Sequence, residues 1–154
     1  MRPAHPAEDG IVGHPGAVGD VHYLSSARGG CEHALDHELT LRAEPAAPRV
    51  ARHWVMRVVA AAGIGGSINQ LVEVLTAELV SDAVRLADED GQVRVWLRIC
   101  EDDVRVAVTS RRPDAPTPSS ATSLALVEVL SNAWGTLPQP DGERTVWFDV
   151  EVAG

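Results

Sequence analysis

Apolar positions follow a helical period most clearly between Ile68 and Ala87. At about 100° per residue, five side chains share one face: Ile68, Leu71, Leu75, Leu79 and Leu86. Ser67 is the expected N-cap of this helix. Glu78 and Asp82 lie four residues apart on the edge of the same face, where two like charges cost an isolated helix about 0.2–0.5 kcal/mol. We therefore expect a metal ion, a cation or a ligand beside them.

Two other stretches show helical spacing. One begins near Ala46, between Pro45 and Pro48, and ends at Ala62, before a cluster of glycines. The other begins at Thr122 or Ser123 and is predicted to continue to Trp134, with Gly135 ending it.

Alternation of apolar and polar residues predicts four strands: His37–Ala43, Val93–Ile99, Val104–Val108 and Thr145–Val152. The order β, α, α, β, β, α, β predicts a two-layer α/β sandwich, a mostly antiparallel sheet covered by helices on one face. Residues 1–36 are predicted to form a flexible N-terminal arm and residues 37–154 the domain. Residues 110–120 contain three prolines and are predicted to form a long loop, of the kind that often acts as a lid.

Composition narrows the class of partner and the compartment. The 154 residues carry a formal net charge of −9 without any basic run, which argues against nucleic-acid or membrane binding. No signal peptide or transmembrane segment is apparent, so a cytoplasmic protein is expected, with Cys31 and Cys100 as free thiols.

Cys31, His33 and His37 have a spacing that could hold a metal, but no second cluster completes a tetrahedral site. The favoured interpretation is scattered histidines in an exposed arm.

Five ordered pieces of the sequence carry a family resemblance: residues 45–52, 78–85, 124–127, 134–135 and 144–148. Together they resemble the GHKL-type, histidine-kinase-like ATPase domain of bacterial anti-sigma factors, which are serine kinases, and the actinobacterial form looks closest. The resemblance extends over about three quarters of the chain and implies a Bergerat-type fold. It also implies Mg-ATP as a ligand, a sigma factor or an anti-anti-sigma protein as partner, and a homodimer.

The same resemblance assigns roles within the helical stretch. Glu78 matches the family's glutamate, which acts as a base or orients the attacking group. Asp82 stands where the family has a magnesium-ligating asparagine. An aspartate can still ligate Mg²⁺ through oxygen, but it adds a negative charge beside the triphosphate.

The other nucleotide positions depart from the family pattern. Ser110 replaces an aspartate that accepts a hydrogen bond from the adenine amino group, at a cost of about 1.5–3 kcal/mol, or roughly ten- to hundredfold in affinity. Ala121 and Ser123 replace two glycines that let backbone N–H groups approach the phosphates. Thr145 matches a threonine near the base, and Arg144 stands at a usually basic position. The changes predict a degenerate nucleotide site.

Three functions are consistent with these residues. The first is a regulatory protein that acts through protein–protein binding, with degenerate or weakened ATP binding. The second is an active Mg-ATP-dependent serine kinase or ATPase that uses Glu78 and Asp82. The third is a fold reused for another small molecule.

A purely structural alternative for Glu78 and Asp82 is an ion-pair cluster with Arg85. Trp96 lies on the polar side of its strand and is expected at an interface.

Overall fold

The computed structural model describes residues 31, 33–111 and 120–152, apart from the side chains of residues 120–123. The elements follow one another in the order β1 (Leu35–Arg42), α3 (Ala47–Ala61), α4 (Gly66–Leu86), β2 (Gln92–Ile99), β3 (Asp103–Arg111), α5 (Ser120–Leu130), β4 (Ala133–Pro138), a short 3₁₀ turn (Pro140–Gly142) and β5 (Glu143–Glu151).

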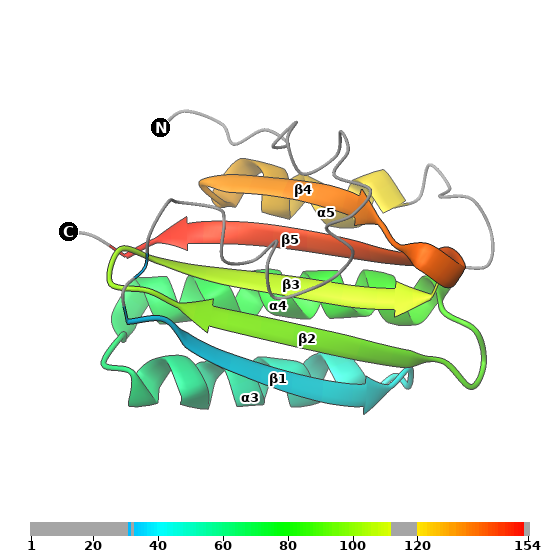
Figure 1. Ribbon diagram of the computed structural model, residues 1–154, viewed down its shortest axis with the longest axis horizontal. Coiled ribbons are helices and arrows are strands. Elements are labelled where there is room, and N and C mark those ends of the chain that lie inside the picture. Colours follow the sequence, from blue (N-terminus) through cyan, green and yellow to red (C-terminus); the bar gives the residue numbers. More distant parts are fainter. Residues whose placement is uncertain (1–30, 32, 112–119, 153–154) are drawn as a thin grey trace.

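The strands form one five-stranded sheet in the order β1-β2-β3-β5-β4, and every neighbouring pair is antiparallel. The described helices α3, α4 and α5 all cover the same face of this sheet (Figure 1). The predicted two-layer α/β sandwich is therefore confirmed.

The main core lies between the sheet and the helices. Alternate strand side chains point into it, and Val95, Leu97, Val106 and Phe148 are completely buried. Helix α4 is central because it contacts α3, α5 and the sheet. Leu75 and Leu79 are buried as predicted, and the buried face of α4 extends further, to Val72, Thr76, Val80 and Ala83. Contact with helices on both sides explains why this face is wider than the apolar stripe predicts.

The beginning of α4 differs from the prediction. The helix starts at Gly66, with Gly65 at the N-cap position and no capping bond from a side chain. Ser67 is therefore inside the helix, so the predicted cap is wrong. Gly63 and Gly66 have φ angles of 90° and 63°, a backbone conformation that glycine adopts without a steric penalty. The chain reverses direction between α3 and α4 through these glycines.

Strand β4 was not predicted. Helix α5 ends at Leu130, and Trp134 and Gly135, expected at the helix end, lie in β4. After α5, the Asn132 N–H donates to the Asp149 carbonyl at 2.8 Å, which directs the chain into pairing with β5. Gly135 lies against the indole of Trp147, where an added Cβ would come within 2.9 Å of Nε1. This glycine permits close contact within the sheet and does not end a helix.

The cysteines also differ from the prediction. Cys31 and Cys100 form a disulfide with their Cα atoms 5.7 Å apart, so the expectation of free thiols is wrong. The usual reducing state of the cytoplasm favours free thiols, and no local sequence pattern indicates that two residues 69 positions apart meet. The bond joins the chain before β1 to the end of β2.

Other predictions fall partly outside the described residues. These include most of the flexible arm over residues 1–36, although β1 begins at Leu35, within that range. They also include the lid predicted over residues 110–120, of which residues 112–119 are not described. No helix among the described residues is long and apolar enough to cross a membrane.

The disulfide generates the first testable prediction. Loop-closure entropy for a separation of 69 residues corresponds to about 4 kcal/mol, so reduction is expected to lower the free energy of unfolding by about 2–4 kcal/mol. Urea unfolding with and without a thiol reductant measures this change. The double variant Cys31→Ser/Cys100→Ser is the control, because its unfolding should not respond to reductant. Equal stability of the oxidised and reduced wild type would contradict the prediction.

Candidate functional site

The two acids of α4 lie in different environments. Asp82 is only 1% exposed, whereas Glu78, one turn earlier, is half-buried. The Arg85 guanidinium Nη2 donates to Asp82 Oδ1 at 2.5 Å. No hydrogen bond or ion pair joins Glu78 to another described residue. The predicted three-residue cluster is therefore an Asp82–Arg85 pair with Glu78 beside it.

Burial explains why Asp82 needs this partner. An ionised carboxylate held away from water is strongly unfavourable unless a cation or several hydrogen-bond donors face it. Arg85 comes from the last turn of α4, where a positive charge also interacts favourably with the helix dipole. The Arg85 side chain remains 43% exposed, so it extends from water to the buried carboxylate.

Ser110 and Arg144 lie at the same end of the molecule as this pair. Ser110 is buried in β3, opposite Val93 of β2 and Arg144 of β5. Strand alternation places Ser110 and Arg144 on the helix-covered face, in phase with the core residues Val108 and Val146. Figure 1 shows that the C-terminal end of α4 and the end of β3 lie at this end of the sandwich. The structure therefore brings three predicted site positions, Asp82, Ser110 and Arg144, to one region.

Thr145 does not join them. It alternates with Arg144 and so lies on the other face of the sheet, which we call the outer face because α3, α4 and α5 do not cover it. Its Oγ1 is 2.6 Å from Thr109 Oγ1 and accepts a hydrogen bond from Gln139 Nε2 at 3.0 Å. The hydroxyl of Thr145 therefore takes part in a buried network on the outer face and does not face α4.

Ala121 and Ser123 lie in the first turn of α5, and their side chains are outside the described part of the structure. The helix begins at Ser120, directly after the undescribed residues 112–119. Helices α4 and α5 contact each other. These two positions therefore belong to the helix that lies beside the helix carrying Asp82.

Magnesium fits the observed arrangement poorly. A ligating carboxylate must offer its oxygen to the ion, and Asp82 Oδ1 already accepts a charged hydrogen bond from Arg85. Within the described residues, no group of three or more His, Cys, Asp or Glu side chains gathers as a metal site. Of the predicted N-terminal cluster, Cys31 is in the disulfide and His33 lies 3.7 Å from Glu101.

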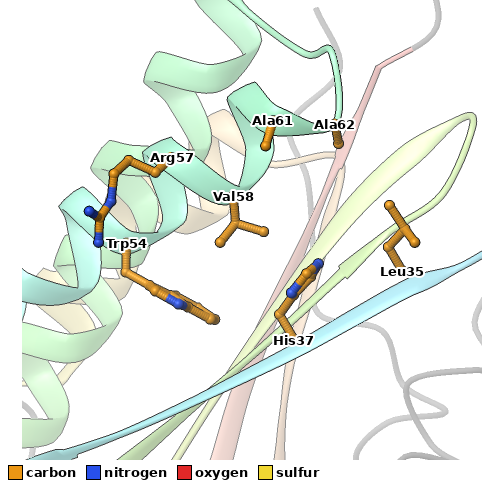
Figure 2. A pocket seen from close by; sticks show the side chains of 7 residues that line it. All are labelled: Leu35, His37, Trp54, Arg57, Val58, Ala61 and Ala62. Carbon is orange, nitrogen blue, oxygen red and sulfur yellow. The ribbon is translucent and has the colours of Figure 1, made fainter.

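A cavity of about 350 Å³ lies elsewhere, between β1 and α3. Its walls are mainly apolar, and Figure 2 shows His37 extending from the strand toward the helix, with Trp54 and Val58 facing it. The complete lining is Leu35, His37, Trp54, Arg57, Val58, Ala61 and Ala62. None of the predicted nucleotide positions contributes to this cavity.

The sequence predictions missed a basic surface on α3. This helix contains three arginines, one histidine and no acidic residue, within a chain whose net charge is −9. Arg52 pairs with Glu73 of α4 at 2.7 Å. Arg49, His53 and Arg57, spaced four residues apart on one exposed side of the helix, have no hydrogen bond or ion pair with another described residue. The absence of acids in this stretch was the signal that could have revealed it.

Comparison with known proteins supports the fold. No protein-family model and no curated protein matches the sequence. A solved structure of the RsbU and RsbW domains of Rv1364c from Mycobacterium tuberculosis matches with a TM-score of 0.62 and 21% sequence identity. The match covers 75% of this chain and 32% of the other, so the present chain corresponds to about a third of that protein. The two share a fold, and their identity is too low to transfer an activity.

The Asp82–Arg85 pair gives the second prediction. Arg85→Ala leaves a buried carboxylate without its guanidinium partner and is expected to lower the free energy of unfolding by about 1–3 kcal/mol. Arg52→Ala is the matched control, because its pair with Glu73 is more exposed and is expected to contribute at most about 1 kcal/mol. Urea unfolding compares the two variants. Equal losses would show that the buried Asp82–Arg85 pair contributes no more stability than the exposed Arg52–Glu73 pair, and would contradict the prediction.

Proposed function

We propose that this protein is a regulatory protein of the anti-sigma type that acts by binding a protein partner and not by turning over ATP. The observation that carries the proposal is the buried Asp82–Arg85 ion pair at the position of the family's magnesium ligand. The fold shared with a structure that contains an RsbW domain supports the class. The partner that the sequence resemblance implies is a sigma factor or an anti-anti-sigma protein.

The ion pair favours this function over a kinase for an electrostatic reason. A magnesium ion that approached Asp82 would meet a carboxylate that is 1% exposed and already paired with the positively charged Arg85 guanidinium, which repels a second cation. Ser110 then offers adenine a neutral hydroxyl in place of a charged acceptor. The Asp82–Arg85 pair and Ser110 each reduce the free energy available for nucleotide binding. Neither feature changes the exposed surfaces through which a protein partner would bind.

Helix α3 is the proposed binding surface. Its exposed Arg49 and Arg57, with His53 between them, lie next to the exposed side chain of Val50 and the partly buried Trp54. A cationic side with apolar residues beside it fits an acidic partner segment that also carries apolar side chains. Because the rest of the protein is acidic overall, α3 is the surface to which such a segment would be steered.

Nucleotide binding gives the third prediction. Isothermal titration of the full chain with ATP and Mg²⁺ is expected to show no micromolar binding, because Asp82 is held by Arg85 and Ser110 lacks the charged acceptor. The comparison protein is the quadruple variant Asp82→Asn/Ser110→Asp/Ala121→Gly/Ser123→Gly, which restores the family residues and should bind more tightly. Micromolar binding by the wild type, or phosphate transfer to a partner protein, would favour the serine kinase instead.

The α3 surface gives the fourth prediction. The double charge reversal Arg49→Glu/Arg57→Glu is expected to weaken binding to a sigma factor or anti-anti-sigma protein of the same organism by roughly tenfold or more. Surface plasmon resonance at two salt concentrations measures the loss, which should appear mainly in the association rate. Arg42→Glu, at the exposed end of β1, is the control and should bind like the wild type. Unchanged binding by the double variant would place the interface elsewhere.

A further inference from the structure

The cavity between β1 and α3 has the size of a small-molecule site. Its volume of about 350 Å³ lies within the range of about 300–1,000 Å³ that is usual for ligand pockets in proteins. The same volume would hold roughly a dozen water molecules at about 30 Å³ each. The cavity lies beside the first strand in the sheet order, far along the sheet from β4 and β5. It is therefore large enough for an organic molecule of modest size.

Small side chains at the end of α3 leave this space open. Trp54, Val58 and Ala61 follow one another at helical spacing, so they share the side of α3 that faces β1. The side chains in this row become smaller toward the end of the helix. The methyl groups of Ala61 and Ala62 stop short of the strand (Figure 2). The cavity therefore arises from the sequence of α3.

Strand alternation keeps the acids of β1 away from the cavity. Leu35 and His37 line it, and they are in phase with Leu39, which packs against the main core. Asp36 and Glu38 alternate with these residues and so lie on the other face of the sheet. Among the described residues that line the cavity, none is acidic.

The polar groups of the cavity are mainly hydrogen-bond donors. The Arg57 guanidinium carries N–H donors and a permanent positive charge, and the Trp54 indole offers one N–H. The His37 imidazole offers at least one more N–H. None of these three side chains has a hydrogen bond or ion pair with another described residue. This set of donors favours an anion, whereas Arg57 would repel a cation.

We propose that this cavity binds a small monocarboxylic acid, with the carboxylate beside Arg57 and an apolar body against Trp54 and Val58. The apolar walls favour a ligand that transfers hydrocarbon out of water. A second charge among these walls would lose its hydration without a partner, which disfavours a nucleotide or another polyanion. A guanidinium can bind a carboxylate through two parallel hydrogen bonds. One charge and an apolar body therefore match the cavity.

Binding of this acid needs no protein partner. Arg57 also belongs to the proposed partner surface on α3, so a bound acid would neutralise one of the cations of that surface. The titration below uses the protein alone. Its failure is therefore distinguishable from a failure of the proposed function, which is tested with a partner or with ATP.

Titration of the ¹⁵N-labelled full chain with octanoate, followed by amide and indole NMR signals, tests the proposal. Octanoate has about ten non-hydrogen atoms and is expected to bind with a Kd of about 1 mM or tighter. Saturable shifts are expected for the Trp54 indole and for the amides of His37 and Ala61. The indoles of Trp96 and Trp147 do not line the cavity and should keep their shifts.

Two variants and a neutral ligand separate the effect of charge from that of space. Arg57→Gln is expected to weaken octanoate binding roughly tenfold, and 1-octanol should bind the wild type more weakly than octanoate by a similar factor. Arg42→Gln, at the other end of β1, is the matched control and should bind octanoate like the wild type. Ala61→Trp fills the cavity and should abolish the shift at His37. Far-UV circular dichroism verifies that each variant is folded.

Each outcome supports or overturns the proposal. Saturable shifts at the cavity that weaken in Arg57→Gln and not in Arg42→Gln support it. No saturable shift at about 10 mM octanoate overturns it. Equal octanoate affinity of Arg57→Gln and the wild type, or equal affinity of the wild type for octanoate and 1-octanol, overturns the assignment of a carboxylate ligand. Shifts that persist in folded Ala61→Trp place the ligand elsewhere and overturn the proposal as well.

Discussion

A carboxylate held out of water must have a cation or a set of donors beside it, and Asp82 meets this requirement through Arg85. The constraint arises from the position of α4, which packs against the sheet and against both other described helices. Position 82 is buried whatever residue occupies it. With aspartate there, the helix supplies its own counter-charge from one turn further on. In a site that binds magnesium and nucleotide, that oxygen would instead be available to the ion.

This constraint connects the fold to the proposed function. Asp82, Ser110 and Arg144 lie toward one end of the α/β sandwich, at the positions that the family resemblance assigns to nucleotide binding. The charge of Asp82 is balanced within the protein by Arg85. On helix α3, by contrast, Arg49 and Arg57 have no hydrogen bond or ion pair with another described residue. In the proposed function such a domain binds a partner protein, and the Asp82–Arg85 pair contributes to the stability of the fold.

Much of the fold could be predicted from the sequence because hydrophobic periodicity is a local property. Alternation located β1, β2, β3 and β5, and helical spacing located α3 and most of α4. Strand β4 was missed because the apolar run from Leu124 to Trp134 is compatible with both a helix and a strand. Only pairing with β5, a contact between distant residues, decides between them. The disulfide was missed for the same reason, since it too joins distant positions.

The candidate site was less predictable because its chemistry depends on which face each residue occupies. Asp82 and Arg85 are close in sequence, so their pairing could be anticipated as an alternative. Thr145 was placed with the nucleotide positions by resemblance alone, although alternation with Val146 and Phe148 assigns it to the outer face. The buried network around Arg105 and Asp149 could not be anticipated, because the two residues are 44 positions apart and meet only through strand register.

The most direct test of the central claim is paramagnetic relaxation in the full chain, with Mn²⁺ and ATP added to an amide NMR sample. Mn²⁺ replaces Mg²⁺ and broadens nearby amide signals strongly. If Arg85 holds Asp82, the signals of Asp82 and Ser110 should broaden no more than those of other buried residues at ATP concentrations in the micromolar range. Selective broadening centred on Asp82 would show that the site still binds metal and nucleotide, and would contradict the account.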